Sequence, residues 1–275
     1  MQCEKIHRRP RICAAHHPRP GSAGLKPLVP HILLFLGAML CAGPACAAAP
    51  LRTDDANPTD AQKWEVDLFS SGTIVQGGGS GVLPGLEVDY GVIDGVQLHL
   101  SQPLGYARSS GKRLGFGSGD TELGLKIRLL KAEESAWWPS LAFAPLIEVP
   151  TGNRSLGLSS GHAQVFLPLW LSKEFGDLTL AAGGGRWTNP GVGNKDWWYA
   201  GVAAVYRVTP DLALGGEIFH QTAPVVGGKD APGFNLGAVL KLTETMNLTA
   251  SAGRGLQNAS RTNALSYYTG LQFNF

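Results

Sequence analysis

The segment Gly157–Gly161 contains the residue types of a serine nucleophile. It reads Gly-Leu-Ser-Ser-Gly, which matches the G-x-S-x-G pattern of hydrolases, and His162 follows directly. In a hydrolase the serine lies on a sharp turn between a strand and a helix. Here a glycine- and serine-rich loop leads into an alternating, strand-like stretch. This context favours a flexible loop, so Ser159 and Ser160 are not predicted to be catalytic.

Two further patterns suggest ligand chemistry but lack the context that it requires. The run Gly115-Phe116-Gly117-Ser118-Gly119 is glycine-rich, yet a phosphate cradle needs a helix N-terminus after it, and a strand pattern follows instead. The histidines beyond position 48 are His99, His162 and His220, which lie on different predicted strands without the close spacing of metal ligands. The sequence therefore predicts no cofactor, no metal site and no enzymatic activity.

The first 47 residues have the three regions of a secretory signal peptide. Six basic residues precede position 30, an apolar run covers Ile32 to Ala42, and Ala45-Cys46-Ala47 provides small residues for cleavage after Ala47. The apolar run is shorter than the ~20 residues of a spanning helix. We expect residues 1–47 to be the signal peptide, 48–62 a flexible lead and 63–275 the folded part.

Removing this segment changes the charge and the cysteine content. The full chain has 23 basic and 21 acidic residues; six of the basic and one of the acidic lie in 1–47, which leaves 17 against 20. The basic balance thus belongs to the export signal and predicts no nucleic-acid partner. All four cysteines lie at or before position 46, so the remainder is not a disulfide-stapled secreted domain.

The residues from Trp64 to Phe275 alternate between apolar and small or polar types, which is typical of strands. In the last run, Leu265 to Phe275, the odd positions are apolar apart from Thr269, and the even ones are Ser, Tyr, Gly, Gln and Asn. Short turns alternate with longer loops, including one at 72–82, as in an outer-membrane barrel. Twelve strands are predicted: 63–71, 83–92, 95–105, 118–130, 139–150, 162–173, 177–187, 196–208, 211–221, 232–243, 246–255 and 264–275.

Aromatic residues near the predicted strand ends are interpreted as interfacial girdles. One group comprises Trp64, Trp137, Trp138, Tyr206, Phe273 and Phe275, and the group at the opposite rim comprises Trp187, Trp197 and Trp198. Phe273 and Phe275 lie on the apolar face of the last strand. We expect these two phenylalanines to act as the signal that the outer-membrane assembly machinery recognises.

Strand parity assigns a set of charged side chains to the barrel interior, since charge facing lipid costs a few kcal/mol near the midplane. They would form either a filter for solutes or a salt-bridged plug, with an acidic arc on the first two strands facing basic positions elsewhere. The predicted set is Glu65, Asp67, Glu87, Asp89, Glu122, Lys126, Arg128, Glu148, Arg207, Glu217, Lys241 and Arg254.

Several short stretches, in order, resemble the outer-membrane family labelled "MetA-pathway of phenol degradation", whose members are described as transporter β-barrels. The resemblance covers about Leu86 to Phe275. It implies a barrel linked by name to the uptake of aromatic compounds, and it supplies no catalytic residues. The matching stretches include Asp89-Tyr90-Gly91-Val92, Gly119-Asp120-Thr121-Glu122-Leu123-Gly124-Leu125-Lys126, Glu148-Val149-Pro150-Thr151-Gly152, Leu167-Pro168-Leu169-Trp170 and Gly233-Phe234-Asn235-Leu236-Gly237.

The sequence thus predicts an all-β protein, a transmembrane antiparallel β-barrel of about 12 strands with both termini periplasmic. We expect it in the outer membrane of a Gram-negative bacterium, among lipids, as a pore or transporter for small aromatic or hydrophobic solutes. Two alternatives remain open at this point. One is an outer-membrane lipid hydrolase or acyltransferase with a Ser/His pair at the barrel rim, and the other is a structural barrel.

Overall fold

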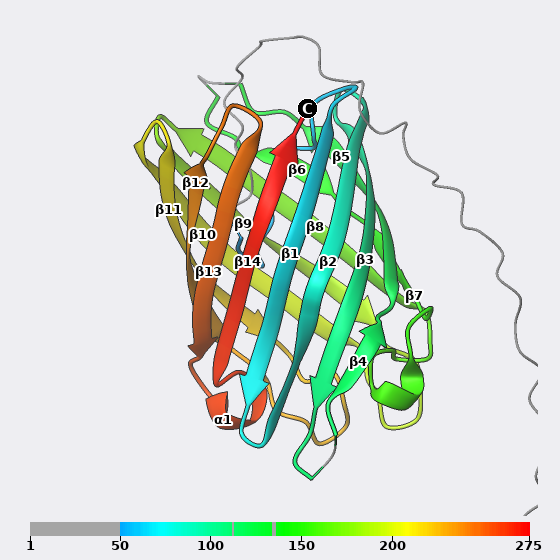
Figure 1. Ribbon diagram of the computed structural model, residues 1–275. Helices are drawn as coiled ribbons and strands as arrows, with labels where there is room; N and C mark the ends of the chain where they lie inside the picture. The colour runs from blue at the N-terminus through cyan, green and yellow to red at the C-terminus, as the bar shows by residue number, and fades with distance from the viewer. Residues whose placement is uncertain (1–49, 112, 134–135) are drawn as a thin grey trace, which may run out of the picture. The chain divides into compact units, whose positions relative to one another are not determined.

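The computed structural model describes residues 50–111, 113–133 and 136–275. The predicted signal peptide, 1–47, lies outside these residues. The chain forms a closed antiparallel barrel (Figure 1). Its strands are β1 (Trp64–Val75), β2 (Gly78–Ile93), β3 (Val96–Arg108), β4 (Gly115–Ser118), β5 (Thr121–Leu130), β6 (Ser140–Phe143), β7 (Leu146–Val149), β8 (Gln164–Phe175), β9 (Leu178–Thr188), β10 (Trp197–Thr209), β11 (Leu212–Gln221), β12 (Gly233–Lys241), β13 (Met246–Gly255) and β14 (Leu265–Asn274).

These segments make a wall of twelve strands, as predicted, because two of them are interrupted. β4 and β5 both pair with β3, and β6 and β7 both pair with β8, so each of these pairs fills one place in the wall. The first strand meets the last, with Glu65 opposite Asn274 and Ile74 opposite Leu265. A closed sheet leaves no strand edge without hydrogen-bond partners, which is what a lipid environment requires.

The two rims of the barrel differ in the length of their connections. At one rim the wall begins and ends together, where the amide of Trp64 donates to the carbonyl of Phe275 over 2.7 Å. The opposite rim carries the longer loops, with a 3-10 turn at Arg154–Leu156 and the short helix α1 (Ala259–Thr262) (Figure 1). Among the described residues, no helix has the length and apolarity needed to cross a membrane.

The prediction of a loop over residues 72–82 is wrong. β1 and β2 continue through this stretch and are joined at Gln76-Gly77, with Gly78 opposite Val75. Gly77 has a φ of +84°, in the left-handed region that a tight hairpin turn needs and that glycine adopts without strain. The small residues of this stretch, such as Gly79 and Ser80, therefore extend a hairpin.

Burial along the wall is reversed relative to a soluble protein. Large aliphatic side chains are exposed on one face of the strands, as Ile218 is at 65%, while its neighbour Phe219 is 2% exposed on the other face. Many of the buried strand residues are polar or charged. In water-soluble proteins such residues are rarely buried. In this barrel they include Asp67, Asp89, Gln97, Ser172, Glu217, Asn235 and Gln272.

Candidate functional site: the barrel interior

The segment from Pro50 to Lys63 is called the lead here, and its residues from Pro50 to Thr59 contact inward-facing side chains of the wall. Its strongest attachment is to Glu217 on β11, whose carboxylate accepts from the amide of Arg52 at 2.8 Å and from the amide of Thr53 at 2.7 Å. The hydroxyl of Thr53 also donates to Glu217 at 2.7 Å. Asn235 on β12 donates to the same carboxylate at 2.6 Å. Glu217 therefore acts as a buried acceptor that fixes the lead to the wall.

Further contacts connect the lead to strands around the barrel. Ser251 on β13 donates to the carbonyl of Pro50 at 2.5 Å, and Ser172 on β8 accepts from the amide of Ala56 at 3.2 Å. On the other side, Lys126 on β5 pairs with Asp54 at 2.8 Å, and Gln97 on β3 accepts from the amide of Thr59 at 2.7 Å. A flexible lead is predicted over 48–62, of which residues 50–62 are described. The described residues of this segment instead have side-chain partners on six strands, β3, β5, β8, β10, β11 and β13, so the segment occupies part of the interior.

Six inward-facing aromatic side chains form a continuous row next to the lead. Phe166 and Trp187 stack with centroids 4.8 Å apart, and Trp187 stacks on Trp197 at 5.3 Å. Phe166 also meets Trp170 edge-on at 6.4 Å. From Trp170 the row continues to Tyr199 and Phe219, at centroid separations of 6.2 and 6.1 Å.

The inner end of this aromatic row meets the lead. The guanidinium of Arg52 lies 4.7 Å from the ring centroid of Phe219, within cation–π range. The hydroxyl of Tyr199 lies 3.0 Å from that of Thr53. The row thus runs from the loop rim, where β9 ends and β10 begins, to the point where the lead crosses the interior.

The interpretation of Trp187 and Trp197 as girdle residues is wrong, because both belong to the inward row. Trp197 shares the parity of Tyr199, which contacts the lead, whereas Trp198 faces outward and is 57% exposed. The sequence of β9 does not show which face points inward, because both faces carry small residues: Ala181, Gly183 and Gly185 alternate with Ala182 and Gly184. Only Trp198 of this group keeps the outward position that a girdle residue needs.

A second cluster, called the acidic patch here, covers the interior side of β1, β2, β3, β5 and β7. Cross-strand pairing places Glu65 opposite Asp89, Asp67 opposite Glu87, and Glu122 opposite Glu148. His99 lies among them, opposite Asp89. Like charges directly opposite each other in a sheet are destabilising, so this surface concentrates negative charge that needs a counter-charge.

The basic residues of the predicted interior set do not form an arc that faces the acidic patch. Lys126 is committed to the lead through Asp54. Three others lie near the short-turn rim and pair with acids there: Arg128 with Asp94, Arg207 with Asp177 and Lys241 with Glu244. In the turn after β2, the hydrogen bond from Arg128 lowers the pKa of Asp94 from its ordinary value.

The predicted inward position of Arg254 is wrong. Arg254 shares the parity of Leu248 and Ala252, which are exposed, whereas the inward positions of β13 are Asn247, Thr249, Ser251 and Gly253. It also lies opposite Phe234, far along the strands from Lys241, which pairs with Asn247. The two residues are therefore not neighbours in the wall.

The serine loop has the hydrogen bonds of a structural turn. The hydroxyl of Ser160 donates to the main-chain carbonyl of His162 at 2.7 Å, and the hydroxyl of Ser159 accepts from the amide of Gly161 at 3.0 Å. Asp120 accepts from the amides of Gly152 and Ser160 and so fixes the loop to the rim. The hydroxyls of both serines therefore bond to the main chain of their own loop, and that of Ser160 also lies 3.5 Å from the carboxylate of Asp120.

Comparison with protein families gives a match over most of the barrel. The profile described as "Putative MetA-pathway of phenol degradation" matches residues 69–273. The chain belongs to this family. A search of curated proteins gives no match. The resemblance inferred from the short motifs is thus confirmed at the level of the family.

Solved structures show the same fold at low sequence identity. An outer membrane channel from Pseudomonas putida F1 matches with a TM-score of 0.69 and 16% identity, covering 82% of this chain and 100% of that one. The NanC porin matches with a TM-score of 0.53 and 11% identity, over 76% of this chain and 98% of the porin. The KdgM porin gives 0.50 and 15%, over 77% and 99%. These likenesses confirm the predicted antiparallel barrel of the family.

Proposed function

We propose that this protein is a pore of the Gram-negative outer membrane through which small aromatic or apolar solutes pass. The observation that carries the proposal is the reversed burial of the closed wall. Its outward face is aliphatic and exposed, which suits contact with lipid tails, and its inward face is polar, charged and aromatic. The neighbours in fold are described as an outer membrane channel and porins, which supports the same conclusion.

The aromatic row supports the class of solute. Planar rings gain about 0.5–1.5 kcal/mol from stacked or edge-on contact beyond the burial of their area. The half-buried Trp187 and Trp197 lie toward the loop rim, where a solute entering from that side meets them first. The family description names phenol degradation, and this agrees with a row that favours aromatic rings. In this account the lead sets the narrow part of the path beside Arg52 and Phe219.

The test uses two adjacent tryptophans that face opposite sides of the wall. In planar bilayers, phenol should interrupt the ion current through the wild-type protein more often and for longer than cyclohexanol, a non-aromatic molecule of similar size. Trp197→Leu should shorten the phenol interruptions by about 2–10-fold, the equivalent of one lost ring contact. Trp198→Leu is the matched control and should behave like the wild type, since Trp198 faces outward. Equal interruption by phenol and cyclohexanol, or equal effects of the two substitutions, would contradict the proposed solute class.

A further inference from the structure

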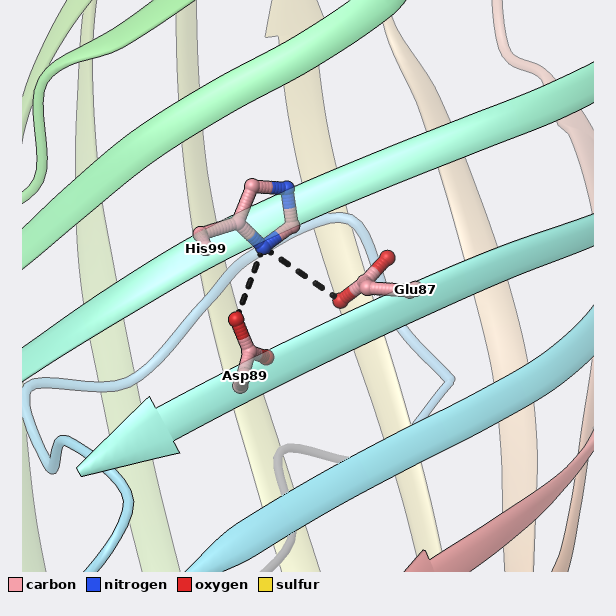
Figure 2. A group of neighbouring side chains, drawn as sticks. All are labelled: Glu87, Asp89 and His99. Atoms are coloured by element: carbon pink, nitrogen blue, oxygen red, sulfur yellow. Dashed lines mark hydrogen bonds and ion pairs between the residues drawn. The ribbon is translucent and has the colours of Figure 1, made fainter.

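Three side chains in the acidic patch converge in the manner of metal ligands. Glu87 and Asp89 lie two residues apart on β2 and project to the same side, and His99 reaches them from β3 (Figure 2). The Nδ1 atom of His99 is 2.9 Å from Oδ1 of Asp89 and 3.8 Å from Oε1 of Glu87. One ligand atom from each residue falls within 4.8 Å of the other two.

The surroundings of this group leave its negative charge unbalanced. Six carboxylates occupy the patch, and Lys126, the lysine beside it, is already paired with Asp54. The Nε2 atom of His99 is buried and has no hydrogen-bond partner among the described residues, with the nearest carboxylate oxygen of Glu122 at 3.9 Å. Buried charges are normally paired or bound to a metal, and a bound cation would balance the carboxylates that His99 alone does not pair with.

We propose that Glu87, Asp89 and His99 bind one divalent first-row transition-metal ion of the zinc type. An imidazole nitrogen together with carboxylate oxygens suits such an ion, whereas Mg²⁺ and Ca²⁺ are held by oxygen ligands alone. Two ligand atoms that are each about 2.1 Å from one zinc ion lie at most about 4.2 Å apart. The group therefore reaches that geometry by side-chain movements of under about 1 Å from its present span of 4.8 Å.

The two nitrogens of His99 then have separate roles. Nδ1 faces both carboxylates and is the metal ligand, and the proton on Nε2 is directed toward Glu122. A metal-bound histidine usually donates its other N–H to a carboxylate, which fixes the ring and its tautomer. The ion would also neutralise the repulsion between the opposed acidic pairs. This site goes beyond the proposed transport function and does not depend on it.

Calorimetric titration of the full folded protein with Zn²⁺ tests the site, with Mg²⁺ titrated in parallel. We expect one equivalent of Zn²⁺ to bind and Mg²⁺ to bind far more weakly. His99→Ala and Asp89→Asn should each weaken Zn²⁺ binding by at least about 10-fold, the smallest effect expected for groups at a metal centre. His220→Ala is the matched control, because His220 forms an exposed pair with Asp230 at 3.6 Å, away from the patch. It should leave the affinity unchanged.

Three results would overturn the site: no stoichiometric Zn²⁺ binding to the wild type, unchanged binding in His99→Ala, or an equal loss in His220→Ala. If His99 is protonated and only ion-paired to Asp89, the wild-type protein will not bind Zn²⁺ stoichiometrically. A second measurement needs no variant and covers the case in which the substitutions prevent folding. Co²⁺ added to the wild-type protein should give a visible ligand-field absorption that one equivalent of Zn²⁺ removes. Absence of that absorption would also overturn the site.

Discussion

Glu217 is the residue on which the position of the lead depends most. Its carboxylate is 3% exposed and accepts hydrogen bonds from the lead and from Asn235. Glu217→Ala removes the acceptor and leaves buried donors without partners, which costs about 1–3 kcal/mol for each such group. We expect a clear drop in thermal stability, measured by heat-modified migration on gels, together with a larger single-channel conductance.

The control for that substitution is Glu244→Ala. Glu244 pairs with Lys241 in an exposed turn, and surface changes of this kind usually stay within about 0.5 kcal/mol. If the two alanine variants have the same melting temperature and the same single-channel conductance, Glu217 does not hold the lead.

At the residue scale, the alternation of apolar and polar residues predicts which side chains face inward. It fails where both faces of a strand carry residues of the same type. Glu87, Asp89 and Glu217 were assigned inward because apolar residues flank them on the strand. Trp187 was misplaced because its strand is built of alanine and glycine, which fit either face. The contact of His99 with Glu87 and Asp89 depends on which strands pair and in what register, and spacing along the chain does not report this.

At the element scale, the acidic patch makes the interior electrostatically one-sided. Exposed pore charges act on ions over about 8 Å at physiological salt and about 3 Å at 1 M. We therefore expect the wild-type pore to prefer cations. Glu122→Gln together with Glu148→Gln should reduce this preference, and the reduction should be greater at low salt.

Reversal potentials in a salt gradient measure that preference. Arg254→Gln serves as the control, since Arg254 lies on the outward parity of β13 and should leave the reversal potential unchanged. A shift with Arg254→Gln as large as that of the double variant would mean that the strand faces have been assigned incorrectly.

The bounds of most strands can be predicted from the sequence, whereas the conformation of the lead cannot. Predicted and observed strands agree closely over β8 to β14, where turn residues such as Gly176-Asp177 and Pro210-Asp211 interrupt the alternation. Residues 50–62 contain no period of either kind. Their conformation is set by long-range contacts, such as that of Thr53 with Glu217, which only the closed wall brings together.

At the scale of the whole molecule, closure of the barrel joins the two ends of the wall. Phe275 exchanges main-chain hydrogen bonds with Trp64, and its side chain is 59% exposed. We expect Phe275→Ala to lower the folded amount in the outer-membrane fraction several-fold, because the assembly machinery loses its terminal aromatic signal. Asn274→Ala, one residue earlier on the inward face, should have little effect. Equal folded amounts of the two variants would show that Phe275 is not part of the assembly signal.

Single-channel recording in planar bilayers tests the central claim, that this barrel is a pore narrowed by its own lead. The experiment compares the folded wild-type chain with a variant that lacks residues 50–62. We expect discrete current steps from both proteins. The steps from the variant should be larger, because the segment anchored to Glu217, Lys126 and Ser172 no longer crosses the interior. Folded protein that gives no steps in either form would contradict the pore.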